Sequence, residues 1–159
     1  MAKHRTGTPW MPAPAYSEGL VAGPSGLSVN LLVRDIAAAV AFQQDVLLTK
    51  VLYHDPDFAA ICGFGGQWCL HADHTYDDHP LVGLMRTTEP SSGRGAGVEI
   101  RLHGCDPDDA EARALAAGYT VLAGSADKAH GLREAYLLDA DGYCWVPGLA
   151  LRRNGDESE

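Results

Sequence analysis

The sequence contains no apolar stretch long enough to cross a membrane. A transmembrane helix needs about 20 consecutive apolar residues, and the longest uninterrupted run here, residues 36–42, has the length of a helix-core segment. Lys3 and Arg5 stand near the start, but no apolar segment follows them, so we expect no secretory signal. From these absences we expect a cytoplasmic protein without a membrane partner.

Basic residues are scarce. The chain has 12 Lys and Arg against 21 Asp and Glu, which gives a formal net charge of −9 and a pI of about 5.1. The basic residues are scattered along the sequence rather than gathered. An acidic surface without a basic face repels a phosphate backbone, so we expect no nucleic-acid partner.

Cysteine pairs with metal-binding or redox spacing are also missing. Cys62, Cys69, Cys105 and Cys144 lie far apart and form neither a CxxC pair nor a zinc-ribbon pattern. We therefore expect reduced thiols that pack as small hydrophobic side chains.

The chain has the length and composition of a single globular domain with two irregular ends. It has 159 residues, of which 46% are hydrophobic, enough for a core. Residues 1–26 carry four Pro and four Gly, which excludes a long helix, and predict an N-terminal arm. Trp10 and Met11 would pin this arm to the body or to a partner; the alternative is a partly ordered tail. Residues 151–159 predict a charged tail.

Between these ends the sequence repeats one pattern, and its first copy begins at about residue 27. Residues 28–33 are β-branched and apolar, which predicts a strand. Asp35 is a typical helix N-cap, and Ile36, Val40, Gln43 and Leu47 follow at helical spacing. The order is therefore strand, cap and helix.

The second copy begins at about residue 97 with the strand-like residues 97–102. Asp106 suits an N-cap, Pro107 the first helical position and Gly118 the helix stop. These signals predict a helix over the residues between Asp106 and Gly118.

Three strand-like segments follow each predicted helix. They cover residues 49–53, 58–63 and 67–71 in the first copy and 120–122, 133–138 and 143–146 in the second. Gly65-Gly66 and Asp141-Gly142 predict matching tight turns. The fold class is therefore α+β: two βαβββ modules, joined by a connection over residues 72–96, whose half-sheets curl around a shared cavity.

Two segments carry a resemblance to a known family. Residues 27–48 resemble the first strand and helix of the vicinal-oxygen-chelate superfamily, and Asp139-Ala-Asp-Gly-Tyr143 resembles its turn before the last strand. The resemblance covers residues 27–150. It implies the glyoxalase/bleomycin resistance fold, and it also implies a homodimer, because this family commonly pairs its chains.

The resemblance further implies where a divalent metal would bind. Counting along the family's pattern places its four ligands at Ser28, Leu70, Gly97 and Val146, with His71 as the alternative to Leu70. Serine, glycine and valine do not supply the imidazole or carboxylate that such a metal needs. We therefore expect no metal at the usual positions and no cofactor.

Strand alternation separates two faces of each predicted half-sheet. Alternate apolar residues of the first strand of each copy should pack on the helices, and the opposite face carries Asn30 in one half and Glu99, Arg101 and His103 in the other. Arg101 could grip an anion, and Glu99 could act as a base or hydrogen-bond acceptor. The alternative is a solvated face with an exposed ion pair.

The connection between the modules is rich in imidazole and carboxylate. His71, Asp73, His74 and His79 have ligand chemistry, so a relocated metal site over His71, His74 and His79 is one hypothesis. The alternatives are a solvated loop, or a pocket-rim role for His74 and Tyr76.

Two further features concern the later strands. Arg133 and Glu134 are neighbours at the start of a strand, and one interpretation is that they only pair with each other across the strand end. Trp68 shares the strand face of Leu70, and we place it among the ligand-binding residues with Asn30, His71, Glu99, Arg101 and His103.

These observations leave three functional hypotheses. The first is a metal-independent protein that binds a small molecule or drug in its cavity. The second is an enzyme, either a metal-free acid/base catalyst using Glu99, Arg101 and His103, or a lyase or dioxygenase with relocated metal ligands. The third is a partner-binding module with a vestigial cavity.

Overall fold

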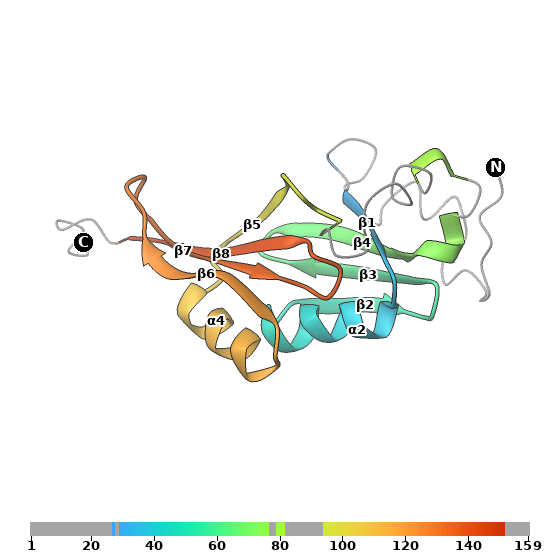
Figure 1. Cartoon of the computed structure of the whole chain (residues 1–159), viewed down its shortest axis with the longest axis horizontal. Helices are drawn as coiled ribbons and strands as arrows, with labels where there is room; N and C mark the ends of the chain where they lie inside the picture. The colour runs from blue at the N-terminus through green and yellow to red at the C-terminus, as the bar shows by residue number, and fades with distance from the viewer. Residues whose placement is uncertain (1–26, 28, 77–78, 82–93, 152–159) are drawn as a thin grey trace. The chain divides into compact units, whose positions relative to one another are not determined.

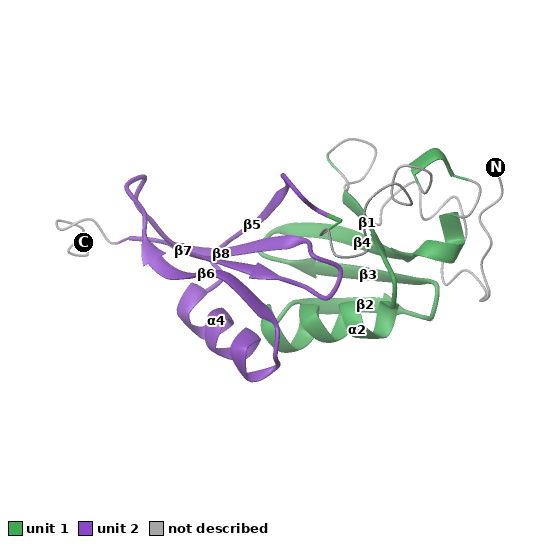
Figure 2. Cartoon of the chain, in the orientation of Figure 1, with its two compact units in different colours: residues 1–94 green, residues 95–159 purple. Residues whose placement is uncertain are grey.

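A computed structural model describes residues 27, 29–76, 79–81 and 94–151 of the chain (Figure 1). It contains two compact units, residues 1–94 (unit 1) and 95–159 (unit 2), as Figure 2 shows. The predicted N-terminal arm, Ser28 and residues 152–159 lie outside the described part. None of the helices in the described part combines the length and the apolar character that crossing a membrane requires.

Unit 1 is one four-stranded mixed sheet with a helix. Its elements are β1 (Val29–Val33), α2 (Ile36–Ala41), the π-helical turn η1 (Phe42–Val46), β2 (Lys50–His54), β3 (Phe58–Gly63), β4 (Gly66–Ala72) and the 3-10 turn η2 (Asp73–Tyr76). The strand order is β1-β4-β3-β2, with β1 parallel to β4 and the other pairs antiparallel.

Unit 2 repeats this topology. It consists of β5 (Glu99–His103), α4 (Pro107–Ala116), β6 (Thr120–Asp127), β7 (Leu132–Leu138) and β8 (Cys144–Ala150), in the order β5-β8-β7-β6. β5 runs parallel to β8, and the remaining pairs are antiparallel. The predicted α+β class and the two βαβββ modules are therefore confirmed.

Both helices begin at the predicted aspartates. The Ala38 backbone N–H donates to the Asp35 carboxylate at 3.0 Å. In unit 2 the backbone N–H groups of Asp108 and Asp109 donate to Asp106, and Pro107 occupies the first turn. These bonds satisfy N–H groups that have no partner inside the helix, which is why short acidic side chains are favoured there.

The first helix differs from the prediction in its second half. Residues 42–46 form a π-helical turn, in which the Leu47 backbone N–H donates to the Phe42 carbonyl. Leu48 then takes a positive φ of 54°, and Gln43, predicted on the inner stripe, is 1% exposed. The helical periodicity of the sequence identified the buried side chains, although it could not show the wider turn.

The strands differ from the prediction mainly in length. β6 and β8 both extend further than predicted, and the predicted Gly65-Gly66 turn lies one residue earlier. Phe64 and Gly65 are the turn residues, with φ of 50° and 75°, as a two-residue hairpin of the I′ kind requires. The prediction missed Phe64 because a non-glycine residue rarely adopts this conformation.

Candidate functional site

The predicted polar row lies on one face of β5 in unit 2. Glu99, Arg101 and His103 alternate along the strand and align with Cys144, Val146 and Gly148 of the parallel strand β8. The buried residue between the last two of the row, Leu102, points to the opposite face, so the alternation predicted from the sequence is confirmed.

Glu134 of β7 completes this row. It aligns with Gly148 of β8, which places its side chain on the face of Arg101. Arg101 forms an ion pair through Nη2 with Glu134 Oε1, and its Nη1 donates to Glu99 Oε2 at 2.9 Å. The Glu134 side chain is 1% exposed, whereas that of Glu99 is 47% exposed. One guanidinium therefore joins a buried and an exposed carboxylate, and we call Glu99, Arg101 and Glu134 the carboxylate cluster.

Arg133 and Glu134 do not pair with each other, so the interpretation of a mutual pair is wrong. Consecutive strand residues point to opposite faces, and Arg133 instead contacts Asp108 of α4 at 2.6 and 2.7 Å and Asp127 of β6 at 2.8 Å. Because Arg133 reaches the helix, the carboxylate cluster lies on the sheet face that α4 does not cover. The hydrogen bond from Arg133 also lowers the pKa of Asp108.

Two further groups lie close to the Glu134 carboxylate. His130 Nε2 lies 3.3 Å from Glu134 Oε1, and the Tyr136 hydroxyl lies 3.5 Å from Oε2. The Lys128 ammonium sits 5.1 Å from the centre of the Tyr136 ring, within the range of a cation–π contact. Unit 2 thus surrounds one buried carboxylate with an imidazole, a phenol and a guanidinium.

Gly148 provides the space for this carboxylate. A Cβ atom at position 148 would lie 3.3 Å from Glu134 Cγ and 3.8 Å from Oε1. Only glycine leaves this space unoccupied, so the Glu134 side chain can pack directly against the β8 backbone at Gly148.

Cys144 lies on the same face beside Glu99. Its pKa is raised by burial, and the negative charges of Glu99 and Asp139 raise it further. A thiol that resists ionisation is a poor nucleophile. The chemistry of this face therefore rests on its carboxylates, imidazole and guanidinium.

The predicted site residues of unit 1 divide between two sheet faces. Leu32 of β1 aligns with His71 of β4 and Asn30 with Cys69, so Asn30 and His71 share a face. Trp68 and Leu70 align with Val29 and Leu31 on the other face. Trp68 is therefore separated from Asn30 and His71 by the sheet, and Leu70 is not the position that faces them.

His71 lies in an aromatic cluster. Its ring centre is 4.9 Å from that of Phe58 and 5.2 Å from that of Tyr76, both in edge-on arrangements. The residue is 7% exposed, and Tyr76 also packs on Leu32. This face of unit 1 is consequently apolar and aromatic, unlike the charged face of unit 2.

The residues at the usual metal positions do not fit a divalent ion. Leu70 and Val146 are buried hydrophobic side chains and Gly97 has none, while Ser28 lies outside the described residues. Across the described ranges, no three His, Cys, Asp or Glu side chains gather in a way that could hold a metal. Among the positions that the family pattern gives, only His71, the alternative to Leu70, has the kind of donor that such an ion requires.

The imidazoles of the connection have other contacts. His74 Nε2 lies 2.7 Å from Asp57, and the Leu81 backbone N–H donates to His79 Nδ1 at 3.1 Å. Asp73 forms two hydrogen bonds with Arg94, at 2.5 and 2.7 Å. The hypothesis of a metal site over His71, His74 and His79 is not supported by these positions, because the described residues contain no group of three ligands.

Sequence reasoning missed Glu134 and His130 as members of the site. The signal was present, because Glu134 and Tyr136 lie two residues apart on β7 and share a face, opposite to that of Arg133. The ion pair between Glu134 and Arg101 joins two strands that are not neighbours in the sheet, and no local pattern indicates such a contact.

No protein-family model matches the chain, and no curated protein sequence does. Solved structures are similar in fold. A glyoxalase/bleomycin resistance protein/dioxygenase family enzyme from Burkholderia phytofirmans PsJN has a TM-score of 0.62 and 22% identity, over 78% of this chain and 97% of that chain.

Two further structures give the same result. A glyoxalase/bleomycin resistance protein/dioxygenase from Nocardioides has a TM-score of 0.59 and 24% identity, over 87% of this chain and 91% of that chain. TioX from Micromonospora sp. ML1 has a TM-score of 0.56 and 22% identity, over 81% of this chain and 98% of that chain. The chain therefore has the glyoxalase/bleomycin resistance protein/dioxygenase fold that its resemblance to the vicinal-oxygen-chelate superfamily implied.

Proposed function

We propose that this protein binds a small organic molecule through the carboxylate cluster of unit 2, without a divalent metal. The observation that carries the proposal is the burial of the Glu134 carboxylate on a sheet face that no helix of the unit covers. Burying a charge costs more free energy than packing an apolar side chain of similar size, even when the charge is paired. A buried charge therefore points to a role other than stability.

The chemistry of the cluster favours a ligand with a positive charge or several hydrogen-bond donors. Glu99 and Glu134 contribute two negative charges against the one of Arg101, whose guanidinium is already shared between them. The expected grip of Arg101 on an anion is disfavoured, because an incoming anion would have to compete with two carboxylates. An amine or amidine would instead find acceptors in Glu99 and Glu134.

The composition supports the same class of ligand. The net charge of −9 attracts cationic molecules over distances of about a Debye length, roughly 8 Å at physiological salt. The solved structures with this fold include two described as glyoxalase/bleomycin resistance protein/dioxygenase proteins, a description that includes resistance to bleomycin among its activities. We therefore favour a cationic, partly aromatic natural product as the ligand.

The test is a thermal-shift screen of metal-depleted full-length protein against amine-bearing and amidine-bearing aromatic compounds, followed by calorimetric titration of each hit. A ligand whose free concentration is about one hundred times its Kd raises the free energy of unfolding by about 2.7 kcal/mol. We expect Glu99→Gln to weaken binding at least tenfold, since it removes the exposed charge that the ligand contacts. Glu134→Gln should weaken binding at least tenfold as well, since it removes the buried charge of the cluster.

Asp45→Asn is the matched control, because it removes one exposed negative charge from unit 1. It should leave the Kd unchanged within twofold. Equal weakening by Asp45→Asn and Glu134→Gln would reduce the effect to net charge. Hits that bind only after a divalent metal is restored would refute metal-independent binding.

A second candidate function is acid/base catalysis without a metal. The distance of 3.3 Å between His130 Nε2 and Glu134 Oε1 favours it, since an imidazole beside a carboxylate can hold and release a proton. Glu99, Arg101 and His103, the residues expected from the sequence, lie on the same face. Turnover of a bound compound that disappears in His130→Gln while its Kd is retained would select the enzyme over the binding protein.

A further inference from the structure

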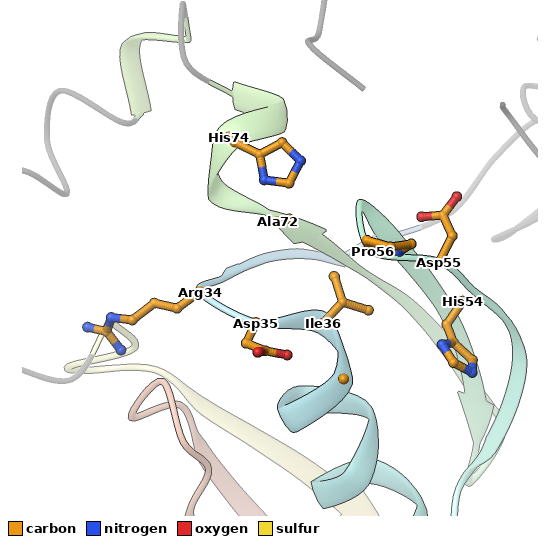
Figure 3. A pocket seen from close by; sticks show the side chains of 9 residues that line it. Arg34, Asp35, Ile36, His54, Asp55, Pro56, Ala72 and His74 are labelled. Carbon is orange, nitrogen blue, oxygen red and sulfur yellow. The ribbon is translucent and has the colours of Figure 1, made fainter. Parts of the chain in front are cut away.

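A pocket in unit 1 lies on the opposite side of its sheet from Asn30 and His71. Ala72 lines the pocket and aligns with Val33, on the face toward α2. The β1–α2 connection, the β2–β3 turn and η2 form the remaining walls (Figure 3). The pocket volume is about 720 Å³, and pockets of roughly 300–1,000 Å³ are typical of sites for small organic molecules.

Part of the lining is apolar. Ile36 and Ala37 contribute from α2, Pro56 from the β2–β3 turn and Ala72 from β4, as Figure 3 shows for the labelled residues. Such walls favour the aliphatic or aromatic part of a ligand, since its surface leaves water on binding.

Two carboxylates of the lining are engaged in holding the local backbone. Asp35 accepts the cap hydrogen bond from Ala38, and Asp55 accepts from the backbone N–H groups of Asp57 and Phe58 and from the Tyr53 hydroxyl. These bonds fix the two turns that enclose the pocket. The carboxylates therefore shape the site.

His74 is a polar residue of the lining whose contact with Asp57 defines the roles of its two ring nitrogens. Its Nε2 lies 2.7 Å from Oδ1 of Asp57, a carboxylate that is 0% exposed, while the His74 side chain is 45% exposed. An ionised carboxylate only accepts hydrogen bonds, so Nε2 must carry the proton. In the neutral ring, Nδ1 then has the lone pair.

We propose that this pocket is a second binding site, for a small, mainly apolar molecule with one acidic hydroxyl group, such as a phenol or an enol. The hydroxyl donates to Nδ1 of His74, and the apolar part lies against Ile36 and Pro56. If the proton moves, the O–H bond breaks and an N–H bond forms at Nδ1. The ligand then becomes an oxyanion, and Asp57 compensates the imidazolium.

The test uses two probes that differ by one methyl group, 4-nitrophenol and its methyl ether 4-nitroanisole, titrated into the full chain below the pH at which free 4-nitrophenol ionises. Only the phenol can donate to His74. We expect the phenol to bind about tenfold more tightly, the effect of one hydrogen bond to a well-placed base. The absorbance of the bound phenol also reports whether its proton has moved.

Two variants of the dyad separate a binding role from a structural one. His74→Ala should retain weak binding of both probes and remove the preference for the phenol. Asp57→Asn should reduce this preference, because the amide gives the ring no negative charge. If His74→Ala changes only the thermal midpoint and keeps the tenfold preference, the dyad is structural and the proposal fails.

The pocket itself is tested by neighbouring residues of α2. Ala37 lines it and is exposed, and Ala38 is exposed but is not among the lining residues. Ala37→Phe should weaken both probes at least tenfold, whereas Ala38→Phe should leave both unchanged. Equal effects of the two substitutions, or probe binding that Glu134→Gln abolishes, would place the probes elsewhere and overturn the proposal.

Discussion

Leu48 and Gly118 occupy the same position in the two repeats. Each lies two residues before the next strand and has a positive φ, 54° for Leu48 and 78° for Gly118. Glycine adopts this conformation readily, whereas for a residue with a Cβ the conformation costs roughly 1–2 kcal/mol of folding free energy. The first repeat therefore contains local backbone strain that the second repeat avoids.

We predict that Leu48→Gly raises the free energy of unfolding by roughly 0.5–1 kcal/mol, because it relieves the strained φ. Glycine also has more conformational freedom in the unfolded chain, and this effect offsets only part of the gain. The Leu48 side chain is 64% exposed, so its removal sacrifices little buried surface. Urea denaturation of both proteins measures the difference. The reverse substitution, Gly118→Leu, should destabilise. A less stable Leu48→Gly protein would contradict the backbone conformation described here.

Gly148→Ala should destabilise the protein by about 1 kcal/mol, since the added methyl group would press on Glu134 Cγ at 3.3 Å. Gly66→Ala is the matched control in a strand of the first repeat, where the nearest atom to a new Cβ is the Gly63 carbonyl oxygen at 3.7 Å. Its stability should change by no more than about 0.5 kcal/mol. Chemical denaturation compares the two; equal stabilities would show that β8 does not confine Glu134.

The ion pair of Asp108 with Arg133 makes part of the stability depend on pH. Arg133 holds the pKa of Asp108 below its usual value of 3.8. A carboxyl with a lowered pKa in the folded state stabilises the fold above its unfolded pKa, and this contribution disappears as pH falls through the folded pKa. Asp108→Asn should therefore be less stable than the parent protein at pH 6, and the difference should shrink below pH 3.8.

Unfolding free energies measured across this pH range test the prediction. Asp109→Asn removes the same charge from the next residue of α4 and keeps the contact between Asp108 and Arg133. A constant difference between Asp108→Asn and the parent protein at every pH would exclude the ion pair as its cause.

Cys105 should resist alkylation in the folded protein. Burial raises the pKa of its thiol from 9.0 to about 11, which reduces the thiolate fraction roughly a hundredfold at a given pH below both values. Cys62 is only partly buried and should react first with iodoacetamide at pH 8. Mass spectrometry of the peptides gives both rates, and in urea the two should converge. Early labelling of Cys105 would mean that its surroundings open readily.

Much of the fold was predictable because its signals are local. Asp35 and Asp106 mark helix starts through hydrogen bonds made within three residues, and Pro107 does so through its fixed φ. Strand alternation separates Leu102 from Arg101. The π-helical turn and the φ of Leu48 were not predictable, since helical periodicity tolerates one wide turn. The lengths of β6 and β8 depend on their partner strands.

The site was predictable only in part. The row of Glu99, Arg101 and His103 follows from alternation within one strand, but the ion pair of Arg101 with Glu134 depends on the order of strands in the sheet. Likewise, the sequence identified His74 as a candidate and contained no sign of its buried partner Asp57. Long-range pairs are set by topology, which a strand-by-strand prediction does not fix.

The parallel pairing of β1 with β4 and of β5 with β8 has a kinetic consequence. In each unit, the last three strands are joined by short turns and can pair with one another early: β2, β3 and β4 in unit 1, and β6, β7 and β8 in unit 2. By contrast, β1 and β5 pair with strands that lie far along the chain, β4 and β8. Closing long loops slows folding, so β1 and β5 should dock last and detach first. Because Glu99 and Arg101 lie on β5, amide exchange in unit 2 should be fast at this edge, and the ligand that we propose for the carboxylate cluster should slow it.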